Sequence, residues 1–380
     1  MKIIFYTHVY PDEHGFLGGI FIHNQAIALK KAGHDVCVCV IDFRSIRKKR
    51  KLFKYKYILD DIVIYRNAIP LSPLNRLIGI TADRLTDKTL SWIVSDFGKP
   101  DIIYAHFGEY AYYVKDYCRR NSIPYAVTEH ASSILTNRLS DIQRQHLSNA
   151  YDNASVVIAV SKALKEKMSP LTCNNIEVIP NIIPDYMFEI GKANEKADHS
   201  DFLFISVGNL IKRKSFDITI QAFDKVTKDN PNVRLLIVGQ GPEDAYLKNL
   251  AKQLGVDDRT EFLGQLDNHE LAKTLRKCDC FVLPSKFETF GVVYIEAMAC
   301  GLPVIATRCG GPEDFVNESN GVLCEVDDVE GIAEAMRYMY GSKKNYLKKC
   351  LNRFAFNLCS EKVFLNKVNL IIRKISIGAN

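Results

Sequence analysis

The chain lacks several features that would place it in other classes of protein. Its eleven cysteines contain no CxxC pair, which favours small, buried apolar residues in a reducing compartment. The N-terminal MKIIFYTHVYP is too short an apolar run for a signal peptide. No apolar run approaches the roughly 20 residues that span a bilayer. We therefore expect a cytoplasmic protein, with peripheral contact at the inner face of the cell membrane left open.

Two phosphate-binding signatures are also missing. No DxD pair is placed to hold Mn²⁺ or Mg²⁺ between two phosphates, so we expect no metal and no resident cofactor. A complete GxGxxG is absent as well, because Asp244 takes the place of the third glycine after Gly239 and Gly241. The net charge of +6 is mild, and nucleic-acid binding does not follow from it.

The length and the apolar pattern predict an α/β protein with two lobes. A chain of 380 residues exceeds one typical core. Buried strand-like runs alternate with helix-like segments, a pattern typical of parallel sheets. The first series of strands is expected at 2–6, 36–40, 62–65, 102–105, 125–128 and 156–160. The second is expected at 202–207, 234–238, 261–263, 280–283, 304–307 and 322–324. Two such series indicate Rossmann-like lobes, with a seam near 180–184.

The segment 287–307 carries the strongest functional signal. Phe290-Gly291 resembles a helix entry, and Cys300-Gly301-Leu302-Pro303 ends that helix before an apolar strand. Free N–H groups at a helix N-terminus suit a phosphate. Glu288 and Glu296 flank this anion site, and their carboxylates can accept hydrogen bonds from sugar hydroxyls. The combination predicts a site for a nucleotide sugar.

The order of motifs resembles family 4 glycosyltransferases. The resemblance covers nearly the whole chain and is most specific in the block 284–316. It rests on Gly18-Gly19, Glu129-His130, the Pro-Asn seam, GN…K at 208–214, GxGP, FLG, PSxxExFG and the glutamate pair. It implies the GT-B fold, two Rossmann-like lobes facing across a cleft, and retention of anomeric configuration without metal. Bacterial enzymes of cell-surface polysaccharide assembly, including teichuronic acid glycosyltransferases, look most similar.

The resemblance assigns roles to charged residues of the second lobe. Glu288 would hold hydroxyls of the donor sugar, Glu296 the ribose hydroxyls, and Lys214 the departing diphosphate. Neither glutamate is expected to be a general acid. The family's arginine and glycine around this lysine are replaced by Asn209 and Ser215, so Asn209, or Arg213 or Lys212, would take over the arginine's part.

The remaining predicted site residues are mostly apolar or glycine. In the second lobe, the helix entry places Phe290, Gly291 and Val292 at the donor, while Gly241 and Leu263 would flank the base. Gly310–Asp314 would either lie beside the donor or cap a helix.

In the first lobe, Gly18 and Gly19 allow close backbone approach to a ligand. His130 follows a buried strand and would touch the donor sugar. His106 also ends a strand and is a second candidate, although a structural role is more usual for a lone histidine.

Two basic segments stand out. Eight of the thirteen residues in 44–56 are Lys or Arg, which indicates either a solvated loop or attraction to anionic lipid or a phosphorylated acceptor. Segment 362–374 has apolar residues at helical spacing, and the resemblance implies a last helix that crosses back onto the first lobe. We therefore expect an acceptor-binding lobe at 1–183, a nucleotide-sugar-binding lobe at 184–355, and a C-terminal helix at 356–380.

These observations favour a retaining, metal-independent hexosyl- or N-acetylhexosaminyl-transferase. It would move a sugar from a nucleotide-diphosphate donor, expected to be a UDP-sugar, to a glycan or lipid-linked acceptor. The catalytic set would be His130, Lys214 and Glu288. Two alternatives remain open, a sugar-nucleotide epimerase of the same architecture and a non-catalytic nucleotide-sugar-binding protein.

Overall fold

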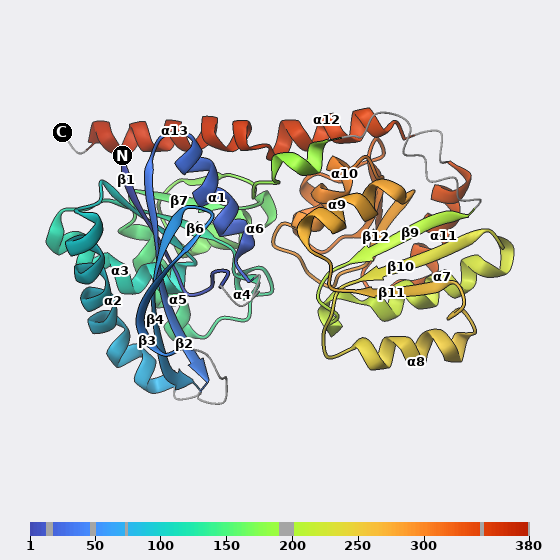
Figure 1. Ribbon diagram of the computed structural model, residues 1–380, viewed down its shortest axis with the longest axis horizontal. Coiled ribbons are helices and arrows are strands. Elements are labelled where there is room, and N and C mark those ends of the chain that lie inside the picture. The colour runs from blue at the N-terminus through green and yellow to red at the C-terminus, as the bar shows by residue number, and fades with distance from the viewer. Residues whose placement is uncertain (13–17, 46–50, 73–74, 190–200, 343–345, 379–380) are drawn as a thin grey trace. The chain divides into compact units, whose positions relative to one another are not determined.

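The computed structural model describes the whole chain except residues 13–17, 46–50, 73–74, 190–200, 343–345 and 379–380. The chain divides into two compact units (Figure 1). Unit 1 comprises Met1–Ile182 and Glu361–Asn380, and unit 2 comprises Ile183–Ser360. Each unit is built on its own β-sheet with helices packed against it.

Unit 1 has an eight-stranded sheet in the order β3-β4-β2-β1-β5-β6-β7-β8. Its strands are β1 (Lys2–Thr7), β2 (Asp35–Ser45), β3 (Phe53–Leu59), β4 (Ile62–Ser72), β5 (Ile102–His106), β6 (Tyr125–Glu129), β7 (Val156–Ala159) and β8 (Ile176–Val178). Its helices are α1 (Ile20–Lys31), α2 (Asn75–Phe97), α3 (Gly108–Asn121), α4 (Ser132–Leu135), α5 (Asp141–Asp152), α6 (Lys162–Met168), the short η1 (Ser169–Leu171) and α13 (Glu361–Gly378).

Every residue of the inner strands β5 and β6 is buried, so both faces of this sheet are covered by helices. On β1, Ile3 and Phe5 share one apolar cluster with α1 and α13. The next side chain in the alternation, Tyr6, points the other way and its hydroxyl lies 2.6 Å from Thr86 Oγ1 on α2. The helix predicted in 362–374 is confirmed as part of α13, whose Phe364, Val368 and Ile371 enter the same cluster.

The end of the basic segment 44–56 forms a strand, where its charge predicted a solvated loop. Residues 46–50 lie outside the described chain, but Phe53–Leu59 form β3, which pairs antiparallel with β4. Asp60 and Asp61 join the two strands with φ of 47° and 61°, the left-handed pair of a tight hairpin. The buried Tyr57 alternates with the exposed Lys56 and Ile58, so charge on one face concealed the period of an edge strand.

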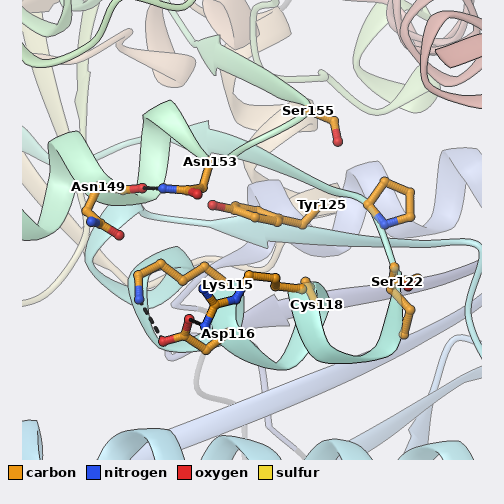
Figure 2. Close-up of a pocket in the computed structure, with 11 residues that line it drawn as sticks. Lys115, Asp116, Cys118, Ser122, Tyr125, Asn149, Asn153 and Ser155 are labelled. Carbon is orange, nitrogen blue, oxygen red and sulfur yellow. Dashed lines mark hydrogen bonds and ion pairs between the residues drawn. The ribbon is translucent and has the colours of Figure 1, made fainter. Parts of the chain in front are cut away.

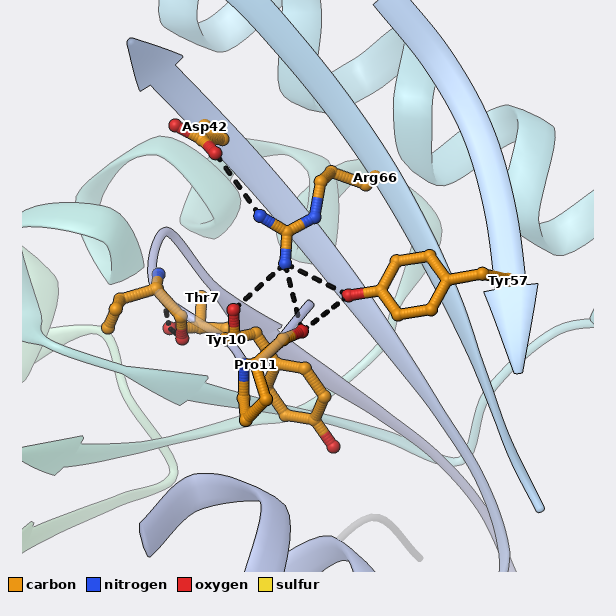
Figure 3. A network of polar contacts seen from close by, with 7 residues as sticks. Thr7, Tyr10, Pro11, Asp42, Tyr57 and Arg66 are labelled. Carbon is orange, nitrogen blue, oxygen red and sulfur yellow. Dashed lines mark hydrogen bonds and ion pairs between the residues drawn. The ribbon is translucent and has the colours of Figure 1, made fainter. Parts of the chain in front are cut away.

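A buried arginine ties β4 to the segment after β1 (Figure 3). Arg66 is 1% exposed, and its Nη2 donates to the carbonyls of Tyr10 at 2.9 Å and Pro11 at 3.2 Å and to Tyr57 Oη at 2.9 Å. Its Nη1 donates to Asp42 Oδ2 at 3.2 Å. Because a buried guanidinium without partners is costly, this network fixes the path of the chain that leads from β1 toward Gly18.

Unit 2 has a six-stranded sheet in the order β11-β10-β9-β12-β13-β14, with parallel pairing throughout. Its strands are β9 (Phe202–Val207), β10 (Val233–Val238), β11 (Thr260–Gly264), β12 (Cys280–Leu283), β13 (Val304–Thr307) and β14 (Gly321–Cys324). Its helices are η2 (Asp185–Phe188), η3 (Lys212–Lys214), α7 (Phe216–Asp229), α8 (Asp244–Leu254), α9 (Asn268–Lys277), α10 (Val292–Ala299), η4 (Gly311–Asp314), α11 (Val329–Gly341) and α12 (Lys348–Cys359).

The two sheets confirm the predicted α/β class with two Rossmann-like lobes. The strands at 202–207, 280–283 and 304–307 have the predicted limits, and the others differ mainly by extension at one or both ends. All eleven cysteines are free, and nine of them are buried, as the scattered spacing predicted. Within the described residues, no helix combines the length and apolar character needed to cross a membrane.

Candidate functional site

The carboxyl ends of the strands in unit 2 are joined by backbone contacts between their loops. Gly208 N–H donates to Val238 O at 3.0 Å, and Gly239 N–H donates to Gly264 O at 2.7 Å. A Cβ atom on Gly239 would lie 1.9 Å from the Gly208 carbonyl oxygen. Only glycine therefore allows the loops after β9, β10 and β11 to approach this closely.

Gly241 is a predicted site residue in this set of loops. A Cβ atom there would lie 2.3 Å from the Leu210 carbonyl oxygen, and Glu243 N–H donates to the same oxygen at 3.0 Å. The glycine brings the loop after β10 against the loop that precedes Lys214. Leu263 lies in β11, next to Gly264, and is half-buried.

Lys214 and Glu288, which are 74 residues apart in sequence, meet as an ion pair. Lys214 Nζ lies 2.5 Å from Glu288 Oε1, and both side chains are mostly buried. Ser285 Oγ donates to the same oxygen at 2.8 Å. Both bonds use Oε1, so Oε2 of this carboxylate has no hydrogen-bond partner in the described part of the chain and stays available to a ligand.

Backbone pairing fixes the position of this glutamate. Glu288 N–H donates to Cys309 O at 2.9 Å, and Glu288 O accepts from Gly311 N–H at 2.7 Å. A Cβ atom on Gly311 would lie 2.4 Å from Phe290 Cα, so the loops after β12 and β13 touch. Glu313 Oε1 accepts from Gly310 N–H at 3.0 Å, which makes this acid a cap of its own short helix η4.

The predicted helix entry at Phe290-Gly291 is confirmed. Gly291 has φ of 86° and precedes α10, whose first residue Val292 is half-buried. The buried Phe290 packs against Phe315, with ring centroids 5.5 Å apart. The helix ends at Cys300 and Gly301, and the latter has φ of 88°, as the sequence predicted.

Glu296 lies on α10 between the buried residues Ile295 and Ala297. Its carboxylate has no hydrogen-bond or ion-pair partner among the residues that the structure describes. Burial raises its pKa from 4.5 to about 7. The pKa of Tyr186 on η2 is raised to about 12, mainly by burial of the phenol and next by the charge of Glu296. The two side chains are therefore neighbours. An unpaired, half-buried carboxylate is a ready acceptor for ligand hydroxyls.

The other polar candidates of unit 2, Arg213 and Asn209, lie in the loop that carries Lys214. Arg213 places its guanidinium 5.2 Å from the ring centroid of Phe287, and its carbonyl accepts from Lys286 N–H at 2.9 Å. Asn209 is exposed in the loop after β9. Both residues therefore lie at the same sheet edge as Lys214.

In unit 1, the glycine pair begins α1. Gly19 has φ of 81° and is the residue before the helix. A Cβ atom there would lie 2.6 Å from the Val9 carbonyl oxygen, so the turn packs directly on the chain that follows β1. Gly18 is half-buried in the same turn.

His130 follows β6 and is held from both sides. Its ring packs against Phe21 of α1 and Phe107, with centroids 4.6 and 5.2 Å away. Its backbone N–H donates to Glu129 Oε1 at 2.8 Å. Glu129 is wholly buried and also accepts from Ala131 N, Gly108 N and Tyr151 Oη. This carboxylate organises the loop, and its role is structural.

Three histidines at this edge are neutral at physiological pH. Burial lowers the pKa of His130 to about 3 and that of His8 to about 4. Burial and the nearby His130 lower the pKa of His106. His106 Nδ1 lies 3.1 Å from His130 Nε2, so the second-ranked histidine contacts the first.

A separate hollow of about 490 Å³ lies where β6 and β7 begin, at the opposite edge of the sheet in unit 1 (Figure 2). Lys115 and Arg119 both pair with Asp116 there, at 2.8 and 3.1 Å. None of the predicted site residues line it. Among the described residues, no group of three or more His, Cys, Asp or Glu is placed to hold a metal ion.

The site contains contributors that the motifs did not single out. Ser285 orients Glu288, and Tyr186 lies beside Glu296. Ser285 stands in the PSxxExFG motif, so its spacing to Glu288 was available as a signal. Tyr186 comes from a segment 110 positions earlier than Glu296, and no local pattern links them.

The pKa of Glu296 makes a prediction about stability. A carboxyl group whose pKa is raised in the folded state stabilises that state below its unfolded pKa, near 4.5, and this contribution is lost as the pH rises through about 7. Glu296→Gln cannot ionise, so it should be more stable than the parent chain by about 3 kcal/mol at pH 8. The difference should vanish at pH 4.5.

Calorimetric unfolding of both chains at the two pH values measures this difference. Glu318→Gln, which removes an exposed acid of the same unit, is the matched control and should change neither value. Equal stability of Glu296→Gln and the parent at pH 8 would show that Glu296 ionises normally.

Comparison with known proteins identifies the family of the chain. Residues 18–185 match the model of "Glycosyltransferase Family 4", and residues 188–352 match "Glycosyl transferases group 1". An N-acetyl-alpha-D-glucosaminyl L-malate synthase of Bacillus anthracis is 37% identical over 191 residues, which is about half of each chain (48% and 49%). The putative teichuronic acid biosynthesis glycosyltransferase TuaC of Bacillus subtilis is 28% identical over 358 residues, covering 88% of each chain.

Solved structures show the same fold. A sucrose-phosphate synthase from Thermosynechococcus elongatus superimposes with a TM-score of 0.82 at 19% identity, covering all of both chains. HepE of Anabaena in complex with UDP-glucose gives a TM-score of 0.73 at 20% identity, covering 100% of this chain and 99% of that one. With two family models matched in sequence over consecutive segments and this fold, the chain belongs to the family 4 glycosyltransferases of the GT-B type.

Proposed function

We propose that this glycosyltransferase uses a UDP-sugar and retains the anomeric configuration of the transferred sugar. The observation that carries the proposal is the edge of unit 2, where Lys214 pairs with Glu288 shortly before α10 begins and the unpaired Glu296 lies on that helix. A cation and a helix N-terminus suit a diphosphate. Two carboxylates with free acceptor capacity suit the hydroxyls of two sugars.

Each charged residue has one part in this proposal. Lys214 neutralises the diphosphate, Glu288 accepts a donor-sugar hydroxyl through Oε2, and Glu296 accepts the ribose hydroxyls. Ligand hydroxyls donate to the ionised form of Glu296. These hydrogen bonds stabilise the charge, so ligand binding lowers the pKa that burial has raised. Gly241 and Leu263 approach the base, while Asn209 or Arg213 supplies the further phosphate contact.

The donor choice is supported by the relatives. HepE was solved with UDP and with UDP-glucose, and the Bacillus anthracis relative is named for an N-acetylglucosaminyl product. We therefore propose UDP-glucose and UDP-N-acetylglucosamine as the first donors to test. GDP is the competing nucleotide, because a GDP-mannose-dependent mannosyltransferase of Corynebacterium glutamicum is 36% identical over a third of the chain.

The proposed reaction needs no nucleophile from the enzyme. The bond from the anomeric carbon to the diphosphate oxygen breaks, and the acceptor hydroxyl oxygen bonds to that carbon on the same face. The hydroxyl proton passes to the departing phosphate oxygen. Lys214 and the N–H groups of α10 stabilise the negative charge as it develops. His130, Gly18 and Gly19 contact ligand at the corresponding edge of unit 1.

Titration calorimetry with UDP tests the donor site. Glu296→Gln and Lys214→Met each remove a charged hydrogen-bond partner, so each should weaken UDP binding by about 1.5–3 kcal/mol, roughly ten- to hundredfold. The matched controls, Glu318→Gln and Lys228→Met, change exposed residues of the same unit and should bind like the parent chain.

If neither site variant alters UDP affinity, these residues are not the donor site. If GDP binds and UDP does not, the nucleotide assignment is wrong. Incubation of the UDP-sugar without acceptor distinguishes the alternatives of the same architecture, because an epimerase converts the donor while a transferase at most hydrolyses it slowly.

We also propose that the reaction needs no metal, since Lys214 and α10 would balance the diphosphate charge. Transfer measured after treatment with EDTA should proceed at the untreated rate. Complete loss of transfer that Mg²⁺ or Mn²⁺ restores would contradict this proposal while leaving the donor assignment intact.

For the acceptor, we propose a glycan or a lipid-linked sugar in cell-surface polysaccharide assembly, as the resemblance to TuaC supports. The basic segment 44–56 would then hold the enzyme at the anionic inner face of the membrane. Lys56 pairs with Asp96 at 2.6 Å, and Lys54 donates to Lys88 O at 3.0 Å, so these two lysines are engaged within the protein. Attraction would depend on Lys48, Lys49, Arg50 and Lys51, of which the first three lie outside the described residues.

Vesicle sedimentation tests this attraction. Replacing those four residues by Ser should reduce binding to anionic vesicles at low salt, since each contributes about 1 kcal/mol near such a surface and salt screens it. UDP affinity should be unchanged. A control with Ser at the exposed Lys228, Lys248, Lys252 and Lys273 should bind vesicles like the parent. Absence of binding by the parent at low salt would favour a soluble glycan acceptor.

A further inference from the structure

The two histidines at the carboxyl edge of unit 1 form a buried pair that the proposed function does not explain. His106 is the last residue of β5, and His130 follows the last residue of the adjacent parallel strand β6. His106 Nδ1 and His130 Nε2 are 3.1 Å apart, which is hydrogen-bond distance. Such a contact needs one proton between the two nitrogens.

Burial leaves both rings neutral, so each ring carries a single N–H. Burial lowers the pKa of each imidazole far below neutrality. His8 is the further titratable side chain facing His130, and it is neutral for the same reason. The shared proton therefore belongs either to His106 Nδ1 or to His130 Nε2, and the choice determines the tautomer of both rings.

The surroundings of His106 decide between these two arrangements. Its ring is fully buried and packs against Phe5 and Tyr104, with centroids 5.2 and 5.0 Å away. Its Nε2 atom is buried without a hydrogen-bond partner in the described chain. If His130 donated the shared proton, His106 would have to keep its own proton on Nε2, where no acceptor receives it. Burying an unprotonated ring nitrogen without a hydrogen-bond donor costs less free energy than burying an N–H group without an acceptor.

The other nitrogen of His130 is in a different situation. His130 is 8% exposed, and its Nδ1 atom, unlike His106 Nε2, is not among the fully buried atoms that lack a partner. The aromatic rings of Phe21 and Phe107 and the Glu129 bond to its backbone hold the residue in place. Nδ1 is thus the ring nitrogen that can meet a ligand.

We infer that His106 is a positioning residue that donates its Nδ1 proton to His130 Nε2 and so holds His130 with its own proton on Nδ1. His130 then presents a fixed donor to a ligand oxygen, such as a sugar hydroxyl, and never a lone pair. The ligand part of this inference rests on the proposed function, whereas the tautomer is a property of the free protein.

The protonation state can be read directly by long-range ¹H–¹⁵N correlation spectra of the full chain labelled at histidine. His106→Phe and His130→Ala identify the two spin systems among the nine histidines. The expected result is Nδ1–H on both rings. Ring-proton NOEs from His130 to Phe21 and Phe107, and from His106 to Phe5 and Tyr104, assign both rings in the wild type as well. Nε2–H on His130 in that spectrum would overturn the inference even if a substituted chain fails to fold.

Substitutions of His106 then separate positioning from packing. His106→Asn places an amide near the position of Nδ1 and should keep His130 in the Nδ1–H form. His106→Gln extends the amide toward the position of Nε2, and His106→Phe fills the space without a donor. In both of these variants His130 should become a mixture of tautomers. An unchanged His130 spectrum in the folded Phe variant would contradict the inference.

Activity with UDP-glucose gives the second readout. His106→Phe should lower kcat/KM by about tenfold, the loss expected for one hydrogen bond, and His106→Asn should restore most of it. UDP affinity should be the same in all these variants. If the spectra show the expected tautomers but UDP does not bind the parent chain, the proposed function fails and the histidine assignment stands. If UDP binds but the tautomers are reversed, the histidine assignment fails and the proposed donor site stands.

Discussion

The parallel arrangement of strands is the constraint on which both groups of candidate residues depend. Parallel strands end at the same edge, so every loop that follows a strand meets its neighbours there. In unit 2 this edge brings Lys214, which follows β9, together with Ser285 and Glu288, which follow β12. In unit 1 it sets His106 against His130. The common direction of the strands therefore brings the polar side chains of each unit to one edge of its sheet.

Close backbone approach is the second requirement. The carbonyls of Gly208 and Leu210 would clash with a side chain at Gly239 or Gly241, and Phe290 would clash with one at Gly311. These glycines let the loops share hydrogen bonds that would otherwise be left unpaired. Backbone contacts hold the loops of this edge together, so Glu288 Oε2 and the Glu296 carboxylate remain available to a ligand.

The two units treat a buried carboxylate in different ways, as Glu129 of unit 1 and Glu296 of unit 2 show. Glu129 is buried and fully satisfied by four donors, which makes it part of the structure. Glu296 is half-buried without a partner, and its pKa rises to about 7. A protein that leaves a carboxylate in this state loses stability at neutral pH unless something binds it. This contrast distinguishes the two acids, although both follow or precede apolar runs in the sequence.

The sequence by itself determined the α/β class, the two series of strands, the helix entry at Phe290-Gly291 and the family. These features are local, since burial pattern and glycine at a positive φ leave their mark within a few residues. It did not reveal β3, because lysines on the exposed face of that edge strand resembled a charged loop.

Only the tertiary structure decided which polar residues meet. The Lys214–Glu288 pair joins residues 74 positions apart, and the His106–His130 contact joins residues 24 apart. Arg66 binds the carbonyls of Tyr10 and Pro11, which precede it by 56 and 55 positions. No local pattern encodes such pairings, because they depend on strand order and register, which are set by the packing of the whole sheet.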